Sequence, residues 1–192
     1  MQNILLAAGL GRRSGGEKLL LPYKGQPIIA HAVEQSLSAG LHTIVVTGYR
    51  GEEIEQALSR FACPNLVLVH NSGYALGQGS STQVGASTLR PHEDFFISLA
   101  DMPLIRASHY HALIHHFASC DALRPLYKGK IGHPVLLRGS FKALIMEQEL
   151  PFTMHALLEE FHVEQCELDD EAYILDIDTM HAYAELLMRP KP

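Results

Sequence analysis

The sequence predicts an α/β fold, with a mostly parallel sheet that carries helices on both faces. Short apolar runs alternate with segments of helical periodicity along most of the 192 residues, and turn-forming residues separate them. A chain of this length fits one domain with a sizeable core, so we take residues 1–192 as a single domain.

The individual elements follow from this alternation. Apolar or β-branched runs predict strands at Asn3–Ala8, Thr43–Thr47, Asn65–His70, Phe95–Leu99, Ala122–Pro125, Pro134–Leu137 and Ala172–Asp176. Helical periodicity predicts helices at Ile28–Ala39, Glu52–Phe61, Ser80–Leu89, Ala107–Ala118 and Met180–Met188. Because ligands of such sheets bind at the carboxyl ends of the strands, we expect the loops after residues 8, 47, 70 and 99 to share one edge.

A glycine-rich loop with two adjacent arginines, residues 7–18, follows the first expected strand directly. Its small residues let a ligand approach the backbone closely. Successive backbone N–H groups in such a loop can bind an anion, and Arg12, Arg13 and Lys18 are placed to neutralise a polyphosphate. An ordinary solvated turn is the alternative interpretation. Because the loop follows a strand, we favour phosphate binding.

Two better-known phosphate loops fit this segment poorly. Gly9-Leu-Gly11 begins the dinucleotide pattern G-x-G-x-x-G/A, but Ser14 stands at its sixth position. That pattern also needs a long helix directly behind the loop, which the prolines at positions 22 and 27 forbid. A Walker loop requires Ser or Thr after its lysine, and Leu19 follows Lys18. We therefore expect the loop to enclose its ligand without a helix directly behind it.

These residues resemble the signature of the MobA-like nucleotidyltransferases, written loosely as LAAGxSxRMGxxKLLLPxxGxP. The matching positions are Leu6-Ala-Ala-Gly9, Arg13, Gly15, Lys18-Leu-Leu-Leu21 and Gly25-Gln-Pro27, and the later landmarks are Thr47-Gly-Tyr-Arg-Gly51, Gly77, Ser80, Ser81, Ala100-Asp-Met-Pro103, Gly132-His-Pro134 and Asp176-Ile-Asp-Thr179. The resemblance is greatest to the molybdenum cofactor cytidylyltransferases, where this spelling goes with CTP and a glycine in place of Ala8 is more usual for GTP. The chain departs from the pattern at Gly11 and Ser14, where Ser and Met are usual.

The resemblance implies a three-layer, Rossmann-like nucleotidyltransferase fold, with a nucleotide-binding part at about residues 1–105 and an acceptor-binding part at about 106–192. It implies Mg²⁺, with Mn²⁺ as the alternative, and CTP or another nucleoside triphosphate. The acceptor would be a phosphorylated small molecule of the molybdopterin type, and a molybdoenzyme would receive the product. The implied nucleotide-binding residues are Ala7, Ala8, Gly9, Leu10, Gly11, Arg12, Gly15, Thr47, Gly48, Tyr49, Gly77, Ser80 and Ser81. The implied catalytic residues are Arg13, Lys18 and Asp101, and the implied acceptor-binding residues are Gly132, His133 and Pro134.

Three aspartates are candidate metal ligands. Asp101 follows an apolar run at the carboxyl end of an expected strand, where a carboxylate facing a triphosphate suits Mg²⁺. A helix cap or turn aspartate is the alternative. Asp176 and Asp178 alternate around Ile177 and so point to the same side of an extended segment. By resemblance to related sugar-activating transferases, Asp178 is the first choice as second ligand and Asp176 the reserve, although Asp178-Thr179 also fits the N-cap of the last helix.

One histidine is a candidate for the acceptor site, and a group of four others has no assigned chemistry. His133 opens an expected strand and either positions an acceptor phosphate, assists its deprotonation or is structural. We favour positioning, because a phosphate nucleophile is already anionic at pH 7. The group consists of His109, His111, His115 and His116, which share one helical stretch but lack the HExxH pattern, so we interpret them as surface residues.

Composition narrows the function classes. The net charge of −6, with the clustered cations confined to the first loop, argues against a nucleic-acid partner. Three scattered cysteines suit a reducing cytoplasm, and we expect neither a leader peptide nor a membrane-spanning segment. Two rivals stay open: a guanylyltransferase or sugar-phosphate nucleotidyltransferase, and a cofactor-binding chaperone that has lost catalysis.

Overall fold

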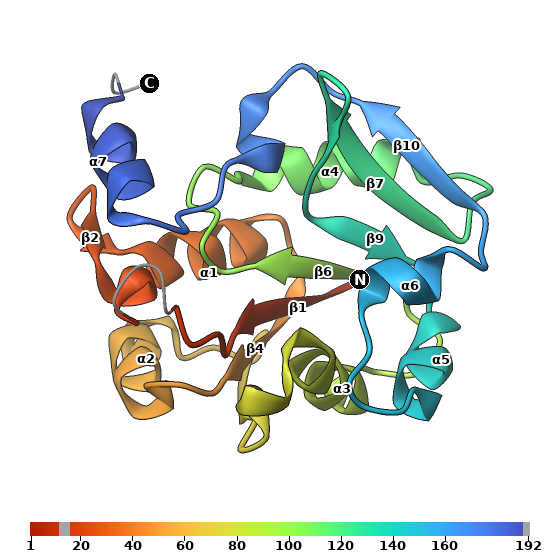
Figure 1. The fold of residues 1–192 in the computed structure, drawn as a ribbon, viewed down its shortest axis with the longest axis horizontal. Coiled ribbons are helices and arrows are strands. Elements are labelled where there is room, and N and C mark those ends of the chain that lie inside the picture. The colour runs from red at the N-terminus through yellow and green to blue at the C-terminus, as the bar shows by residue number, and fades with distance from the viewer. Residues whose placement is uncertain (12–15, 190–192) are drawn as a thin grey trace.

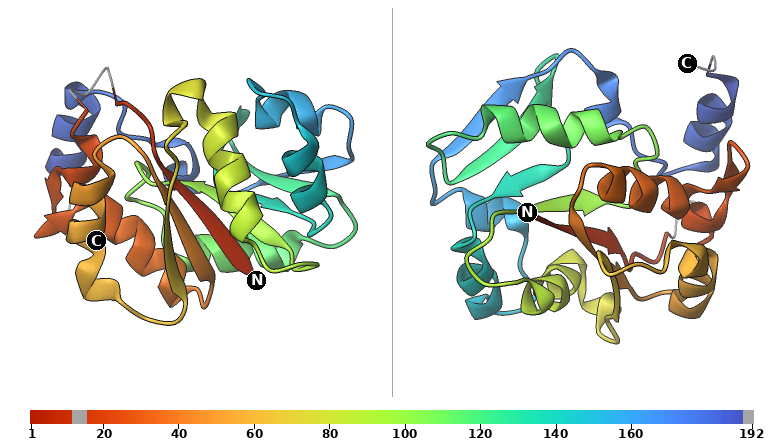
Figure 2. Two further views of the ribbon diagram at one scale, coloured as in Figure 1. Left: turned by 90° about the horizontal axis from the view of Figure 1, so that it is seen from below. Right: turned by 180° about the vertical axis from the view of Figure 1, so that it is seen from behind.

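A mixed sheet forms the centre of the molecule, and helices pack on both of its faces (Figures 1 and 2). The computed structural model describes residues 1–11 and 16–189. The strands follow the order β10-β7-β9-β6-β1-β4-β5. They span Gln2–Ala7 (β1), His42–Thr47 (β4), Leu66–His70 (β5), Phe95–Leu99 (β6), Ala122–Tyr127 (β7), Val135–Leu137 (β9) and Val163–Glu167 (β10). Strand β9 is antiparallel to β6 and β7, whereas the other neighbours in this order are parallel.

The helices form the outer layers. Helices α3 (Gln78–Thr88), α5 (Phe141–Glu147) and α6 (Met154–Leu158) cover one face, while α1 (Ile28–Ser38), α2 (Gly51–Leu58) and α4 (Ala107–His116) cover the other (Figure 2). Helix α7 (Met180–Met188) packs beside the second group through Leu186. Within the described ranges, no helix has the length and apolarity needed to cross a bilayer.

Strand β1 shows why both faces of the sheet must be covered. Ile4 and Leu6 pack in the apolar cluster under α3 and α5, whereas Leu5 and Ala7 pack in the cluster under α1 and α2. A parallel strand with helices on both sides is apolar on both faces, which is why its sequence is a continuous apolar run. The predicted α/β class, with its mostly parallel sheet, is confirmed.

One predicted strand is wrong. Residues Glu171–Ile174 form a 3₁₀ turn, where a strand was expected at Ala172–Asp176. The Asp170 side chain caps this turn by accepting the Ala172 N–H at 2.9 Å, and Tyr173 is buried against α4. The edge strand beyond β7 is instead β10, and helices α5 and α6 were also not among the predicted elements.

The segment behind the glycine-rich loop contains no long helix, as predicted. A three-residue 3₁₀ turn at Lys18–Leu20 leads into a hairpin of β2 (Pro22–Tyr23) and β3 (Gln26–Pro27) before α1 begins. The parallel strands β1, β4, β5 and β6 end at one edge of the sheet, so the prediction that their loops share an edge is confirmed.

His109 on α4 is buried, contrary to the expectation that this group lies on the surface, while His111, His115 and His116 are exposed. The backbone N–H of Arg106 donates to His109 Nδ1 at 2.9 Å, so Nδ1 is unprotonated and Nε2 donates to Asp170 Oδ2 at 3.0 Å. Burial lowers the pKa of His109, and this effect outweighs the opposing attraction of Asp170. The folded protein therefore holds His109 as neutral imidazole.

We expect the folded state to lose stability as the pH falls below about 6.5, the ordinary histidine pKa. Because the pKa of His109 is lower in the folded state than in the unfolded chain, the unfolded chain takes up the proton first, and the stabilising effect is complete only above the unfolded pKa. His109→Gln, which cannot titrate, should be less stable at pH 8 but show a shallower loss between pH 7 and 5. Urea unfolding of both proteins at pH 8, 7 and 5 measures the free energy of unfolding and its dependence on pH. An equal slope in both proteins would contradict the assignment.

Candidate functional site

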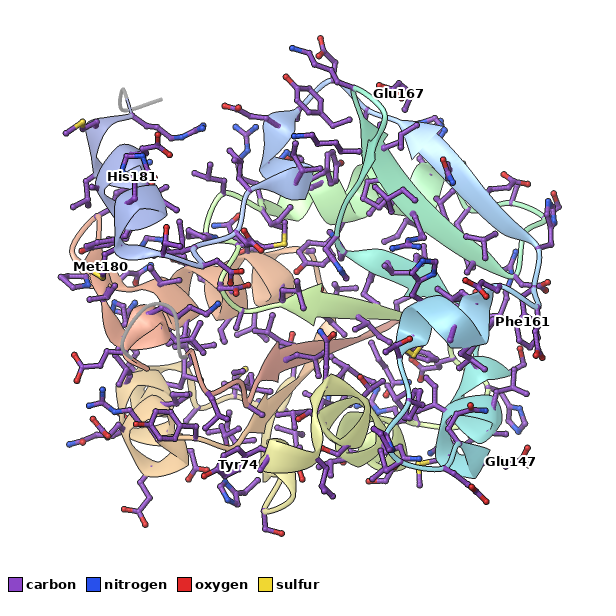
Figure 3. All side chains as sticks on the ribbon, in the orientation of Figure 1. Tyr74, Glu147, Phe161, Glu167, Met180 and His181 are labelled. Atoms are coloured by element: carbon purple, nitrogen blue, oxygen red, sulfur yellow. The ribbon has the colours of Figure 1, made fainter. Side chains whose placement is uncertain are left out.

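A cavity of about 510 Å³ opens at the carboxyl edge of the sheet. This volume lies within the range of about 300–1,000 Å³ that is usual for small-molecule sites. Its wall comes from the loop after β1, the start of the 3₁₀ turn behind it, the segment between β5 and α3 to which Tyr74 belongs (Figure 3), and the ends of β6 and of the chain segment before α7. The lining residues are Leu6, Ala7, Ala8, Gly9, Leu10, Gly11, Lys18, Leu19, Tyr74, Ala75, Gly77, Gln78, Ser81, Leu99, Asp101, Asp176 and Asp178.

The described part of the glycine-rich loop is shaped for close approach by a ligand. A Cβ built at Gly9 meets nothing within 4 Å, so this position opens onto space. Gly11 has a φ of 53°, in the left-handed region that glycine adopts without strain. Behind the loop, Gly48 leaves no room for a side chain, because its Cβ would lie 2.8 Å from the Ala8 Cβ. The loop backbone is thus packed on one side and open on the other.

Three carboxylates converge on the wall of this cavity. The backbone N–H of Ile177 donates to the carbonyl of Asp101 at 3.0 Å, which holds the segment before α7 against the end of β6. One oxygen each from Asp101, Asp176 and Asp178 lies within 4.8 Å of the others. Ile177 itself is buried, so the two aspartates that flank it face the same side, as the alternation predicted.

The alternative capping roles of these aspartates find no support. The side chain of Thr179, not of Asp178, caps α7 by accepting the Ala182 N–H at 3.1 Å. The next helix after Asp101 begins at Ala107, with Arg106 as its N-cap. Both carboxylates are therefore available for charge interactions within the cavity.

Lys18 supplies the counter-charge to this cluster. Its Nζ contacts Asp101 Oδ2 and lies 2.9 Å from Asp178 Oδ1. Burial alone would lower the pKa of Lys18, but the two carboxylates outweigh it and raise the pKa above its ordinary value. Partial desolvation and the negative charges of Asp101 and Asp178 raise the pKa of Asp176. The cluster thus carries more negative charge than Lys18 neutralises.

The donor set fits a hard divalent cation. Asp101 Oδ1 is buried, and within the described residues it has no hydrogen-bond partner. A buried carboxylate oxygen without a partner is costly, and a metal ion would satisfy it. Mg²⁺ prefers one or two carboxylates together with phosphate oxygens and water, which this wall and an adjacent triphosphate would provide.

The other predicted site residues divide by position. Gly77 and Ser81 line the cavity, whereas Thr47, Gly48, Tyr49 and Ser80 do not. Thr47 is buried behind the wall, and Ser80 is held by Asn71 and by the carbonyls of residues 73 and 77. Arg12, Arg13 and Gly15 lie outside the described residues.

A second, smaller cavity of about 160 Å³ adjoins the first and shares Leu6 and Gln78 with it. His133 lines this cavity, as does Arg124 from the middle of β7. Gly132 is required beside them, because a Cβ there would lie 2.1 Å from the Tyr173 carbonyl oxygen. Sequence reasoning missed Arg124, although a charged residue inside the apolar run of a strand is a signal that could have marked it.

The comparisons with known proteins agree with this arrangement. A family model described as the MobA-like NTP transferase domain matches residues 3–165. The molybdenum cofactor cytidylyltransferase of Escherichia coli (strain K12) is 30% identical over 177 residues, covering 92% of this chain and 90% of that protein. The nicotine blue oxidoreductase of Paenarthrobacter nicotinovorans is 25% identical over 198 aligned positions, covering 96% and 95%.

Solved structures share the fold. Rv0371c from Mycobacterium tuberculosis H37Rv superposes with a TM-score of 0.84 at 21% identity, over 98% of this chain and 97% of that chain. A structure of Rv0371c in complex with manganese superposes with a TM-score of 0.78 at 20% identity, over 98% of each chain.

Proposed function

The chain belongs to the MobA-like NTP transferase family, and on this premise we propose that it is a metal-dependent nucleotidyltransferase that transfers CMP from CTP to the phosphate of a molybdopterin-type cofactor. The observation that carries the proposal is that one cavity combines an open glycine-rich loop, Lys18 and three converging carboxylates. This combination suits a triphosphate with its metal ion. The named activity of the cytidylyltransferase relative supports CTP as the donor.

In the proposed reaction, the chain positions and neutralises charged groups. The backbone of the loop at Gly9 to Gly11 holds the triphosphate, and Arg13 and Lys18 neutralise its β- and γ-phosphates. Lys18, which in the structure pairs with Asp101 and Asp178, would exchange these partners for the phosphates of the nucleotide, and a bound metal would balance the charge of the two carboxylates. Asp101, Asp176 and Asp178 would hold Mg²⁺ or Mn²⁺, which when bound neutralises charge at the α-phosphate.

The bond changes need no general base. An oxygen of the acceptor phosphate forms a new bond to the α-phosphorus of CTP. The bond from the α-phosphorus to the oxygen that bridges to the β-phosphate breaks, and pyrophosphate leaves with the electron pair. Because the acceptor phosphate is already anionic at neutral pH, His133 has a positioning role. Burial lowers the pKa of His133, with the charge of Arg124 adding to the effect, so the imidazole is neutral at pH 7.

The proposed cellular compartment and the protein that receives the product follow from the proposed substrate. The product would pass to a molybdoenzyme in the cytoplasm, where the three cysteines, all free, stay reduced. The chaperone alternative predicts binding without turnover, so pyrophosphate release from CTP and a molybdopterin acceptor distinguishes the two functions.

We expect CTP with Mg²⁺ to raise the thermal midpoint more than GTP with Mg²⁺. Ala8 is buried and packs against Gly48, which leaves a small apolar surface beside the loop. Saturating nucleotide at 100 times Kd should stabilise the folded state by about 2.7 kcal/mol. Ala8→Gly, which deletes only the methyl group, should narrow the difference between the two nucleotides. Equal or greater stabilisation by GTP would refute CTP specificity but would not contradict the proposal that the protein is a nucleotidyltransferase.

A further inference from the structure

Arg124 differs from four other arginines of the fold. Arg50, Arg106, Arg138 and Arg189 each have a carboxylate oxygen within 3.1 Å. Arg124 is partly buried in β7, yet among the described residues it has no carboxylate partner, and its Nε has no hydrogen-bond partner. Burial alone lowers the pKa of Arg124, because no anion offsets it. A desolvated guanidinium without a partner is costly to keep in a fold unless it binds something.

His133 presents a second unpaired group to the same cavity. Its Nδ1 is buried and, among the described residues, has no hydrogen-bond partner, whereas the ring donates a hydrogen bond to the backbone of Ile97. The loop around it is fixed, since the His133 N–H donates to the Tyr173 carbonyl and the Gly132 N–H donates to the Pro125 carbonyl, each at 2.8 Å. Arg124 therefore offers an unpaired N–H donor beside the fixed loop of His133, whose neutral ring nitrogen Nδ1 can only accept a hydrogen bond.

The size and lining of the cavity limit what these atoms bind. Its volume of about 160 Å³ is too small for a whole cofactor but adequate for one ionic group of a larger ligand. None of the described residues that line it is acidic. Gln78, the first residue of α3, lies on the wall it shares with the larger cavity, so the positive end of that helix adds to the attraction for an anion.

We propose that Arg124, with the His133 loop as the adjoining wall, forms an anion subsite that holds the phosphomonoester group of the acceptor beside the nucleotide cavity. This inference rests on the proposed function and makes it more specific. The planar guanidinium would bind two phosphate oxygens, and a third oxygen would be left to attack the α-phosphorus. An acceptor that reacts through an alcohol oxygen would leave Arg124 unpaired, so the subsite selects phosphorylated acceptors.

The test uses inorganic phosphate as the probe and the Arg124 Nε–H resonance as a direct readout. Wild-type protein is titrated with phosphate, alone and with Mg²⁺ and a non-hydrolysable CTP analogue occupying the larger cavity. The expected result is a saturable shift of this resonance in both conditions. Arg124→Met and Arg124→Gln, followed through the His133 ring signals, should bind phosphate at least about tenfold more weakly, since a charged bidentate contact is lost. The CTP analogue should bind both variants within about twofold of wild type.

Two further measurements distinguish phosphate binding by Arg124 from a purely structural role of this residue. Arg124→Met should have a thermal midpoint equal to or above that of wild type, because it removes a partly buried cation that has no carboxylate partner among the described residues. Arg60→Met removes an exposed arginine outside both cavities and should leave phosphate affinity unchanged. Unaltered phosphate affinity in both Arg124 variants, or weakened nucleotide binding in its place, would overturn the subsite. If wild type binds no nucleotide, the proposed function fails, and the titration with phosphate alone still decides the role of Arg124.

Discussion

Asp101→Asn is expected to remain folded and to lose nucleotidyl transfer by a factor of about 10²–10³, the scale on which one charge-stabilising group acts in a transition state. Asparagine has the shape of aspartate but no negative charge. Asp101 caps no helix, and its one ion pair among the described residues is with Lys18 at the cavity wall, so the fold should tolerate loss of the charge. Lys18 keeps Asp178 as a partner in the variant.

Pyrophosphate release and nucleotide-dependent melting, each with Mg²⁺ and with EDTA, measure this effect. Asp169→Asn changes an exposed aspartate outside the cavity and serves as the charge-matched control. An Asp101→Asn protein with the wild-type response to Mg²⁺ would refute Asp101 as a metal ligand. Wild-type activity that is independent of Mg²⁺ would refute the metal-dependent transferase.

Lys18→Ala should lower kcat/KM by about two orders of magnitude. It should also lower the thermal midpoint in EDTA, because three carboxylates whose oxygens lie within 4.8 Å would then repel one another without the charge of Lys18 beside them. Mg²⁺ should restore most of that stability but little of the activity, since the metal replaces Lys18 at the carboxylates and not at the phosphates.

The same melting and turnover assays decide this prediction. Lys130→Ala, at an exposed lysine of β8 (Lys130–Ile131), is the matched control and should behave as wild type. If Lys18→Ala keeps its full turnover, the loop binds something other than the triphosphate. If EDTA and Mg²⁺ give equal midpoints in Lys18→Ala, the carboxylates do not share a metal.

Local patterns in the sequence predicted much of the fold, the glycine-rich loop and the pair of aspartates before α7. The apolar run before the glycine-rich loop defined β1, and the alternation around Ile177 correctly placed Asp176 and Asp178 on one side. Prolines behind the loop correctly excluded a long helix.

The failures arise where tertiary contacts decide the structure. The apolar Ala172 and Tyr173 suggested a strand, but burial against α4 and the Asp170 cap make a 3₁₀ turn. Helices α5 and α6 are only seven and five residues long, which is too short for a clear period. A charge inside the apolar run of a strand could have marked Arg124 as unusual, but its lack of a partner depends on its neighbours in space, which no local pattern shows.

The hydrogen bond from Ile177 to the Asp101 carbonyl has a consequence for the order in which the protein is made. Every strand of the central sheet is complete by Glu167, and the family match ends at residue 165. A nascent chain that has emerged only this far contains every strand of the sheet and the glycine-rich loop, but it carries one of the three converging carboxylates. The remaining two arrive with the segment that Ile177 fastens to the sheet. The three carboxylates therefore come together only when the segment through Asp178 is in place on the finished sheet.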